Sequence, residues 1–109
     1  MAYDEELALR VRGLLSDRDG ISERRMFGGL SFLLHGHMFC GVLGDELVVR
    51  VGGEQSATAL EQPHARPMDF TGRPLKGYVY VAAEGTAADD ALRAWVDRGA
   101  EFADSLPPK

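Results

Sequence analysis

The chain has 109 residues, of which 45% are hydrophobic, so it has the size and composition of one globular domain spanning residues 1–109 rather than of a disordered chain. Its single cysteine, Cys40, excludes an internal disulfide, and the charged N-terminal stretch argues against a signal peptide. With no apolar run of membrane-spanning length, we expect a cytoplasmic protein that does not associate with a membrane. The formal net charge is −5, and residues 21–80 carry six basic and six acidic side chains, so we expect no specific binding to duplex DNA.

The first segment predicts an amphipathic helix from Asp4 to about Asp17. Asp4 is a suitable N-cap residue, and Gly20 ends the segment. The apolar residues recur on one stripe, which consists of Leu7, Val11, Leu14 and Leu15.

A meander of three strands follows the helix. Residues 26–34 and 37–43 are strand-like, and His35-Gly36 between them suits a two-residue hairpin turn. Gly44-Asp45 predicts a second such turn, which leads into a third strand over residues 46–51.

The second half of the chain predicts a short helix over residues 54–62 and a strand over residues 78–81. Between them lies a loop rich in proline and glycine, with at most a brief strand at residues 68–70. Thr86 and Asp89 resemble a capping box at the start of a final helix. The apolar stripe of this helix consists of Ala88, Ala91, Leu92, Trp95, Val96, Phe102, Ala103 and Leu106.

This order of elements predicts an α+β domain with two layers. A largely antiparallel sheet of about five strands forms one layer. The N-terminal, middle and C-terminal helices pack on one face of that sheet and form the other.

The predicted register suggests a function for the second sheet face. The turns place Phe32 opposite Phe39 and Cys40 opposite Val49, so one face is aliphatic and suits packing under the helices. The other face is also apolar, although two-layer packing covers only one. We therefore predict an interaction surface there, unless the final helix or the proline-rich loop covers it. Its candidate residues are Phe32, His37, Phe39, Arg50, Tyr78 and Tyr80.

The segment RRMFGGLSFLLHGHMFCGV contains residue types that occur in active sites. His35, His37 and Cys40 could in principle bind zinc, but His37 and Cys40 are an odd number of positions apart and point to opposite faces of a strand. The same alternation separates a Cys40 nucleophile from a histidine base. The pair Gly28-Gly29 lacks the spacing of a phosphate-binding loop, and we interpret it as a close approach of backbones or a bulge. We predict no catalytic, cofactor-binding or metal-binding residue, and a buried, inert Cys40.

The same segment, together with ELVVRVG, ARPMDFTGRPLKGYVYV and the acidic final helix around Trp95, closely resembles the TfoX/Sxy N-terminal domain family. The resemblance covers the chain from about Tyr3 to Leu106, and RRMFGG and the run from HARPMDFTGRP to YVYV are its most specific parts. It implies a small bacterial cytosolic α+β domain in which two or three helices flank a five-stranded antiparallel sheet. The family signature present here is Arg25, Met26, Phe27, Gly28 and Gly29, which we interpret as structural.

The family is named after regulators of natural competence, in which this domain precedes a helix-hairpin-helix-like C-terminal domain. Because the chain ends at Lys109, we expect a stand-alone version that lacks the second domain. The resemblance transfers no catalytic residue. We therefore expect a non-enzymatic regulatory or protein-interaction domain that binds another protein or itself, self-association giving a homodimer. The alternative is a small-molecule-binding or enzymatic domain that uses the face with aromatic residues and arginine.

Overall fold

The computed structural model describes residues 3–26, 29–67 and 77–107. Its elements, in chain order, are α1 (Glu5–Leu15), β1 (Ile21–Met26), β2 (Gly29–Leu34), β3 (His37–Leu43), β4 (Glu46–Arg50), α2 (Ser56–Leu60), β5 (Ala65–Pro67), β6 (Tyr78–Val81), the 3-10 helix η2 (Ala83–Thr86) and α3 (Asp89–Asp104).

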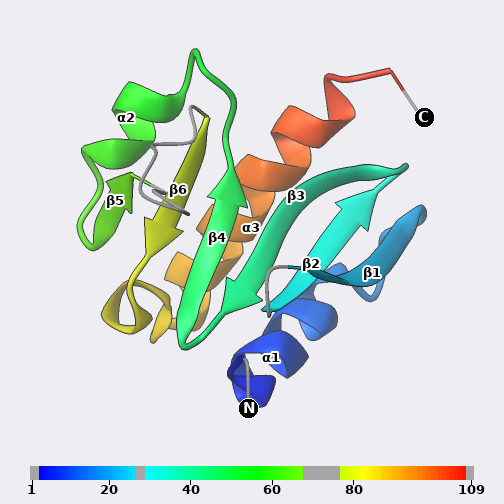
Figure 1. Ribbon diagram of the computed structural model, residues 1–109, viewed down its shortest axis with the longest axis horizontal. Helices are drawn as coiled ribbons and strands as arrows, with labels where there is room; N and C mark the ends of the chain where they lie inside the picture. Colours follow the sequence, from blue (N-terminus) through cyan, green and yellow to red (C-terminus); the bar gives the residue numbers. More distant parts are fainter. Residues whose placement is uncertain (1–2, 27–28, 68–76, 108–109) are drawn as a thin grey trace.

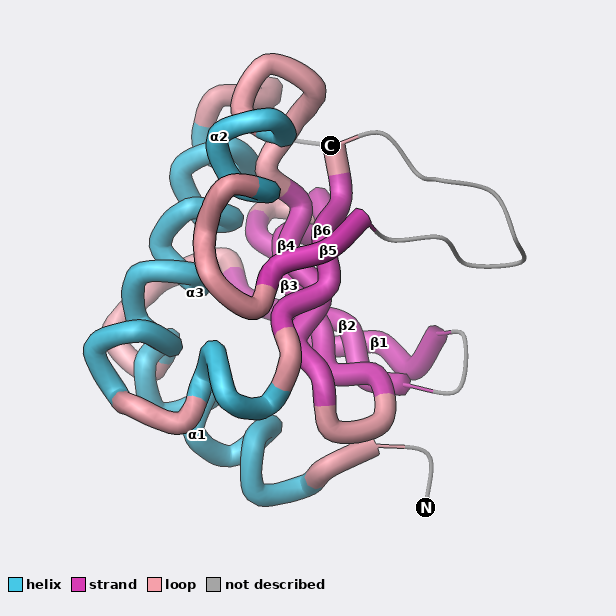
Figure 2. The backbone as a smooth tube through the Cα atoms, turned by 90° about the vertical axis from the view of Figure 1, so that its left-hand side faces the viewer, coloured by secondary structure: helices cyan, strands magenta, loops and turns pink. Residues whose placement is uncertain are grey.

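The strands form one antiparallel sheet in the order β1-β2-β3-β4-β6-β5 (Figure 1). All three α-helices of the described residues lie on the same side of this sheet (Figure 2). The predicted α+β class is therefore confirmed, but the sheet has six strands rather than about five. We call the two sides of the sheet the helix face and the helix-free face.

The additional strand is β1, which the sequence pattern did not predict. Its sequence, ISERRM, shows no apolar alternation, because β1 lies at an edge of the sheet and residues 22–25 are exposed. β1 pairs with β2 up to Met26 opposite Gly29. The predicted continuous strand over residues 26–34 is thus wrong at its start, since the chain reverses direction between Met26 and Gly29.

Both predicted hairpin turns are present, but the register between β2 and β3 differs from the prediction. The ladder shifts between Phe32 and Leu33, so that Leu33 pairs with Met38 whereas Phe32 pairs with Cys40. Phe39 is the extra residue of this irregularity and has no partner in the ladder. The predicted pairing of Phe32 with Phe39 is therefore wrong, although Cys40 does pair with Val49 as predicted.

The shift in register moves two predicted surface residues into the core. A one-residue slip turns side chains to the opposite face of a sheet. Phe32 and Phe39 are both fully buried in the main hydrophobic cluster, together with Leu7 and Val11 of α1 and Trp95 of α3. The prediction that Phe32 and Phe39 belong to an interaction surface is thus corrected.

The N-terminal helix has the predicted cap and the predicted apolar stripe. Asp4 Oδ1 accepts hydrogen bonds from the backbone N–H groups of Glu6 (2.9 Å) and Leu7 (3.2 Å), which would otherwise be unsatisfied. The stripe packs against the sheet and α3. Its buried residues are Leu7, Ala8, Val11 and Leu15.

The C-terminal helix packs as predicted but begins differently. Its N-cap is Ala88, which provides no side-chain hydrogen bond, and Thr86 lies in η2, where its hydroxyl donates to the carbonyl of Ala83 (3.2 Å). The predicted capping box is therefore wrong. Trp95 is only 6% exposed and belongs to the core cluster, so the apolar stripe of α3 faces the sheet.

The segment between β4 and β6 is only partly predicted by the sequence. The middle helix is present as α2, and its Ala59 is fully buried in the core. β5 lies within the predicted loop and pairs with β6. The brief strand predicted at residues 68–70 lies outside the described residues.

Candidate functional site

The helix-free face carries a second, smaller apolar cluster. Val48 and Tyr80 are its buried members, on the neighbouring strands β4 and β6. Three partly buried residues from β3 and β6 pack against them: Met38, Leu43 and Tyr78. An apolar cluster on the side away from the helices is consistent with the predicted arrangement, although most of its members differ from the predicted ones.

Two arginines lie over the tyrosine rings of this cluster. The guanidinium carbon of Arg66 is 4.5 Å from the centre of the Tyr80 ring, and the same guanidinium forms a bidentate ion pair with Glu46. Arg66 lies opposite Tyr80 across β5 and β6, so both side chains point to the same face. Arg66 and its ion-pair partner Glu46 therefore lie at one edge of the cluster, next to Tyr80.

Arg50 lies between two aromatic rings from different parts of the chain. Its guanidinium carbon is 5.7 Å from the centre of the Tyr78 ring on β6 and 5.1 Å from that of Phe102 on α3. Its Nη1 also donates to the carbonyl of Met38 (3.5 Å). Met38 lies beyond the end of the β3–β4 ladder, whose last pair on this side is Cys40 with Val49. Arg50 thus contacts both the helix-free cluster and the C-terminal half of α3.

His37 lies on the helix face, not on the predicted surface. It pairs with Leu34, whose side chain belongs to the core. The His37 side chain is 9% exposed, and its Nε2 lies 2.5 Å from the carbonyl oxygen of Pro107, shortly after α3. Of the six predicted surface residues, the structure therefore places three on the helix-free face, namely Arg50, Tyr78 and Tyr80.

Cys40 is fully buried in the core, where desolvation raises the pKa of its thiol far above the ordinary value. A thiol in this state is a poor nucleophile and a poor metal ligand. Within residues 3–26, 29–67 and 77–107, the structure contains no group of three or more His, Cys, Asp or Glu side chains that could hold a metal ion.

Part of the signature segment has a structural explanation. Gly29 begins β2, and a Cβ atom at this position would collide with the backbone carbonyl oxygen of Val42 on β3. The residue thus permits a close approach of two strands, which was one of the two interpretations of Gly28-Gly29, the other being a bulge. Arg25 is exposed on β1, whereas Phe27 and Gly28 lie outside the described residues.

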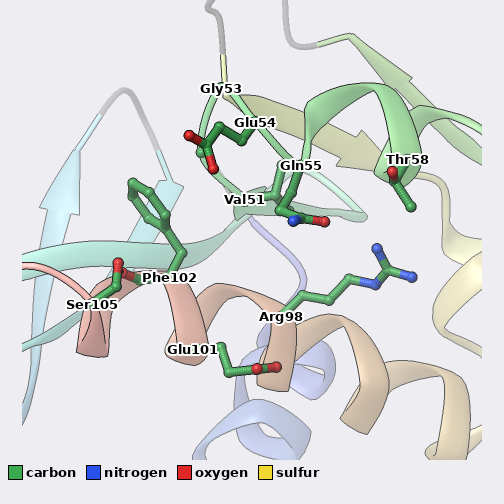
Figure 3. Close-up of a pocket in the computed structure, with 10 residues that line it drawn as sticks. Val51, Gly53, Glu54, Gln55, Thr58, Arg98, Glu101, Phe102 and Ser105 are labelled. Atoms are coloured by element: carbon green, nitrogen blue, oxygen red, sulfur yellow. The ribbon is translucent and has the colours of Figure 1, made fainter.

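A pocket of about 850 Å³ lies between α3 and the segment that joins β4 to α2 (Figure 3). Val51 to Gln55 and Thr58 form one wall. Arg98, Glu101, Phe102 and Ser105 of α3 form the other. The sequence pattern did not reveal this pocket, because its two walls are at least 40 residues apart in the chain and meet only through the packing of α3 on the sheet. The nearest sequence feature to the pocket is the glycine pair Gly52-Gly53, which follows β4 and lines one wall.

The described residues contain no helix with the length and hydrophobicity needed to cross a membrane. A search against protein families matches residues 13–103 to the TfoX N-terminal domain. No curated protein and no solved structure gives a significant match. The matched residues are most of the chain and include β1 to β6 and nearly all of α3, the elements that build both surfaces described above. The chain belongs to the TfoX N-terminal domain family.

Proposed function

We propose that this protein is a non-enzymatic regulatory domain of the competence-regulator type, which acts in the cytoplasm by binding a protein partner through its helix-free face. The observation that carries the proposal is the apolar cluster formed by Met38, Leu43, Val48, Tyr78 and Tyr80 on that face. Tyrosine, arginine and methionine are enriched in protein interfaces, and buried tyrosine and arginine contacts often dominate their affinity.

The charges around the cluster favour a partner with an acidic rim. By register, the charged residues of the described helix-free face are Arg24, Arg50, Arg66 and Glu46, which gives three positive charges against one negative. The chain as a whole has a net charge of −5. An acidic partner surface would be attracted to this face and repelled by the rest of the protein, which gives orientation as well as affinity.

The same charges disfavour a second copy of the chain on this face. A two-fold symmetric dimer brings identical patches together, so the arginines of one copy would approach those of the other. We therefore propose a different protein as the occupant. Direct binding to duplex DNA is not part of the proposal, because the few arginines here provide too few phosphate contacts for binding at physiological salt.

The test compares Met38 with Leu9. Met38 is a partly buried member of the helix-free cluster, whereas Leu9 lies on α1 and is 61% exposed, which makes it a matched apolar control on the other side of the molecule. A photo-crosslinking phenylalanine analogue is placed at each position in the native cell, and adducts are identified by mass spectrometry. The identified partner is then purified and its Kd is measured for wild type, Met38→Glu and Leu9→Glu.

We expect adducts with another protein from position 38 only. Met38→Glu should weaken binding to the purified partner at least about 30-fold, since a charge enters an apolar interface, while Leu9→Glu should change it less than about two-fold. Both variants should remain folded by circular dichroism. Adducts formed only with a second copy, adducts confined to position 9, or an unchanged Kd for Met38→Glu would each contradict the proposal.

A further inference from the structure

The pocket between α3 and the β4–α2 segment is separate from the helix-free cluster and has the size of a small-molecule site. Its volume of about 850 Å³ falls within the usual range for ligand pockets, about 300–1,000 Å³. Val51 and Phe102 provide apolar surface, and polar or charged side chains surround them. Glu54, Gln55 and Thr58 are exposed, so the pocket is open to solvent at this side.

The α3 wall holds two side chains in fixed positions. Arg98 and Phe102 are four residues apart and therefore lie on one face of the helix. The guanidinium carbon of Arg98 is 5.1 Å from the centre of the Trp95 ring, and Figure 3 shows this side chain extending toward α2, where Thr58 lies. The Phe102 ring is held by Arg50 at 5.1 Å and by direct packing against Gly52. Side chains that are already positioned lose little entropy when a ligand binds.

The charges of the pocket are not neutralised by one another. Arg98 has no carboxylate within ion-pair distance among the described residues, although Glu101 is only three positions away on the same helix. Glu101 and Glu54 likewise form no ion pair within the described part of the chain. Within the described residues, the pocket thus presents one guanidinium and two carboxylates that form no ion pair, together with an aromatic ring.

From this combination we infer that the pocket binds a zwitterionic small molecule of the amino-acid class with an apolar side chain. The ligand carboxylate would accept hydrogen bonds from Arg98, and its ammonium group would donate to Glu101 or Glu54. The apolar side chain would pack against Phe102 and Val51. The net charge of the pocket groups is −1, which opposes nucleotides and other polyphosphates.

This binding activity goes beyond the proposed partner surface, and its test is independent of that surface. L-Phenylalanine is titrated into the full chain by isothermal calorimetry, with the fluorescence of Trp95, the only tryptophan, as a second readout. Phenethylamine, which lacks the carboxylate, 3-phenylpropionate, which lacks the amine, and ATP serve as comparison ligands. Because the rim is exposed to water, we expect a Kd of about 0.1–1 mM for phenylalanine. Each analogue with a single charge should bind at least about 10-fold more weakly.

The matched variants are Arg98→Gln and Arg93→Gln. Both arginines lie on α3, but Arg93 is exposed and does not line the pocket. Arg98→Gln should weaken phenylalanine binding at least about 10-fold and leave phenethylamine binding unchanged, while Arg93→Gln should bind both like wild type. A urea titration of each variant checks that it is folded. The inference is overturned if phenylalanine does not bind saturably, if ATP binds more tightly than phenylalanine, or if Arg98→Gln binds phenylalanine as wild type does.

Discussion

Gly99 offers the sharpest test of how α3 packs on the sheet. It is a buried residue in the middle of the helix, and a Cβ atom placed there would collide with the backbone carbonyl oxygen of Phe39. The same atom would lie 3.3 Å from Cγ1 of Val49. Because the colliding atom belongs to the backbone of β3, it cannot rotate away as a flexible side chain could. Gly99→Ala must therefore move the helix or the strand.

Gly99→Ala should lower the free energy of unfolding, whereas Gly→Ala at an ordinary helix position raises it. Replacing glycine by alanine inside a helix normally stabilises it by about 1 kcal/mol. Overpacking a core typically costs about 1–3 kcal/mol, and a collision with backbone belongs near the upper end. We therefore expect Gly99→Ala to lower the free energy of unfolding by about 1–2 kcal/mol. For a domain of this size that corresponds to a fall in Tm of roughly 4–10 °C.

Urea unfolding followed by Trp95 fluorescence measures this difference directly. Gly13→Ala is the matched control, since Gly13 is also helical and exposed, and a Cβ atom added there would meet no neighbouring atom within 4 Å. It should raise the free energy of unfolding by up to about 1 kcal/mol. If Gly99→Ala is as stable as wild type or more stable, α3 does not cross β3 as closely as described.

Four further outcomes are expected. Cys40 should react with thiol reagents only on unfolding, because burial raises the pKa of its thiol, and Cys40→Ala should cost about 1–2 kcal/mol in urea unfolding. Trp95→Ala should cost roughly 3–5 kcal/mol, and the native protein should show blue-shifted tryptophan emission. A double-mutant cycle between Arg12 and Glu23, whose side chains are 41% and 34% exposed, should give only about 0.5 kcal/mol at low salt. The hydrogen bond from Arg12 lowers the pKa of Glu23, so this contribution should be complete above the ordinary pKa of 4.5 and disappear as pH falls through the lowered value. Arg50→Met should cost about 1–2 kcal/mol of stability, because it removes the contacts of the guanidinium with two aromatic rings.

The parts of the fold that the sequence predicts are those specified by neighbouring residues. Asp4 caps α1 through the backbone N–H groups two and three positions ahead, which needs no tertiary context. The turn at His35-Gly36 places both residues at positive φ, 51° and 88°, a pairing typical of two-residue hairpins. The apolar stripe of α3 likewise predicts that Trp95 is buried, because helical periodicity alone selects the buried face.

The parts that the sequence does not predict depend on contacts across the sheet. Nothing local marks the ladder shift between Phe32 and Leu33, yet this shift decides that Phe32 and Phe39 are core residues. The strand β1 is equally hidden, since an exposed edge strand can be almost entirely polar. Of the residues predicted for the interaction surface, only Arg50, Tyr78 and Tyr80 lie on the helix-free face.

Arg50 connects the two surfaces that carry the proposals. On one side its guanidinium lies over Tyr78, which belongs to the helix-free cluster, and on the other over Phe102, which lines the pocket. A substitution at Arg50 therefore changes both surfaces at once and cannot tell partner binding from ligand binding. Met38 and Arg98 avoid this difficulty, because Met38 packs in the helix-free cluster and Arg98 lies over Trp95 in the pocket wall. A ligand that contacts Phe102 and shifts the Arg50 guanidinium would also change the contact of Arg50 with Tyr78, and with it the affinity of the helix-free face for a partner. Thermodynamic linkage then requires that the bound partner changes the affinity for the ligand by the same factor as the ligand changes the affinity for the partner.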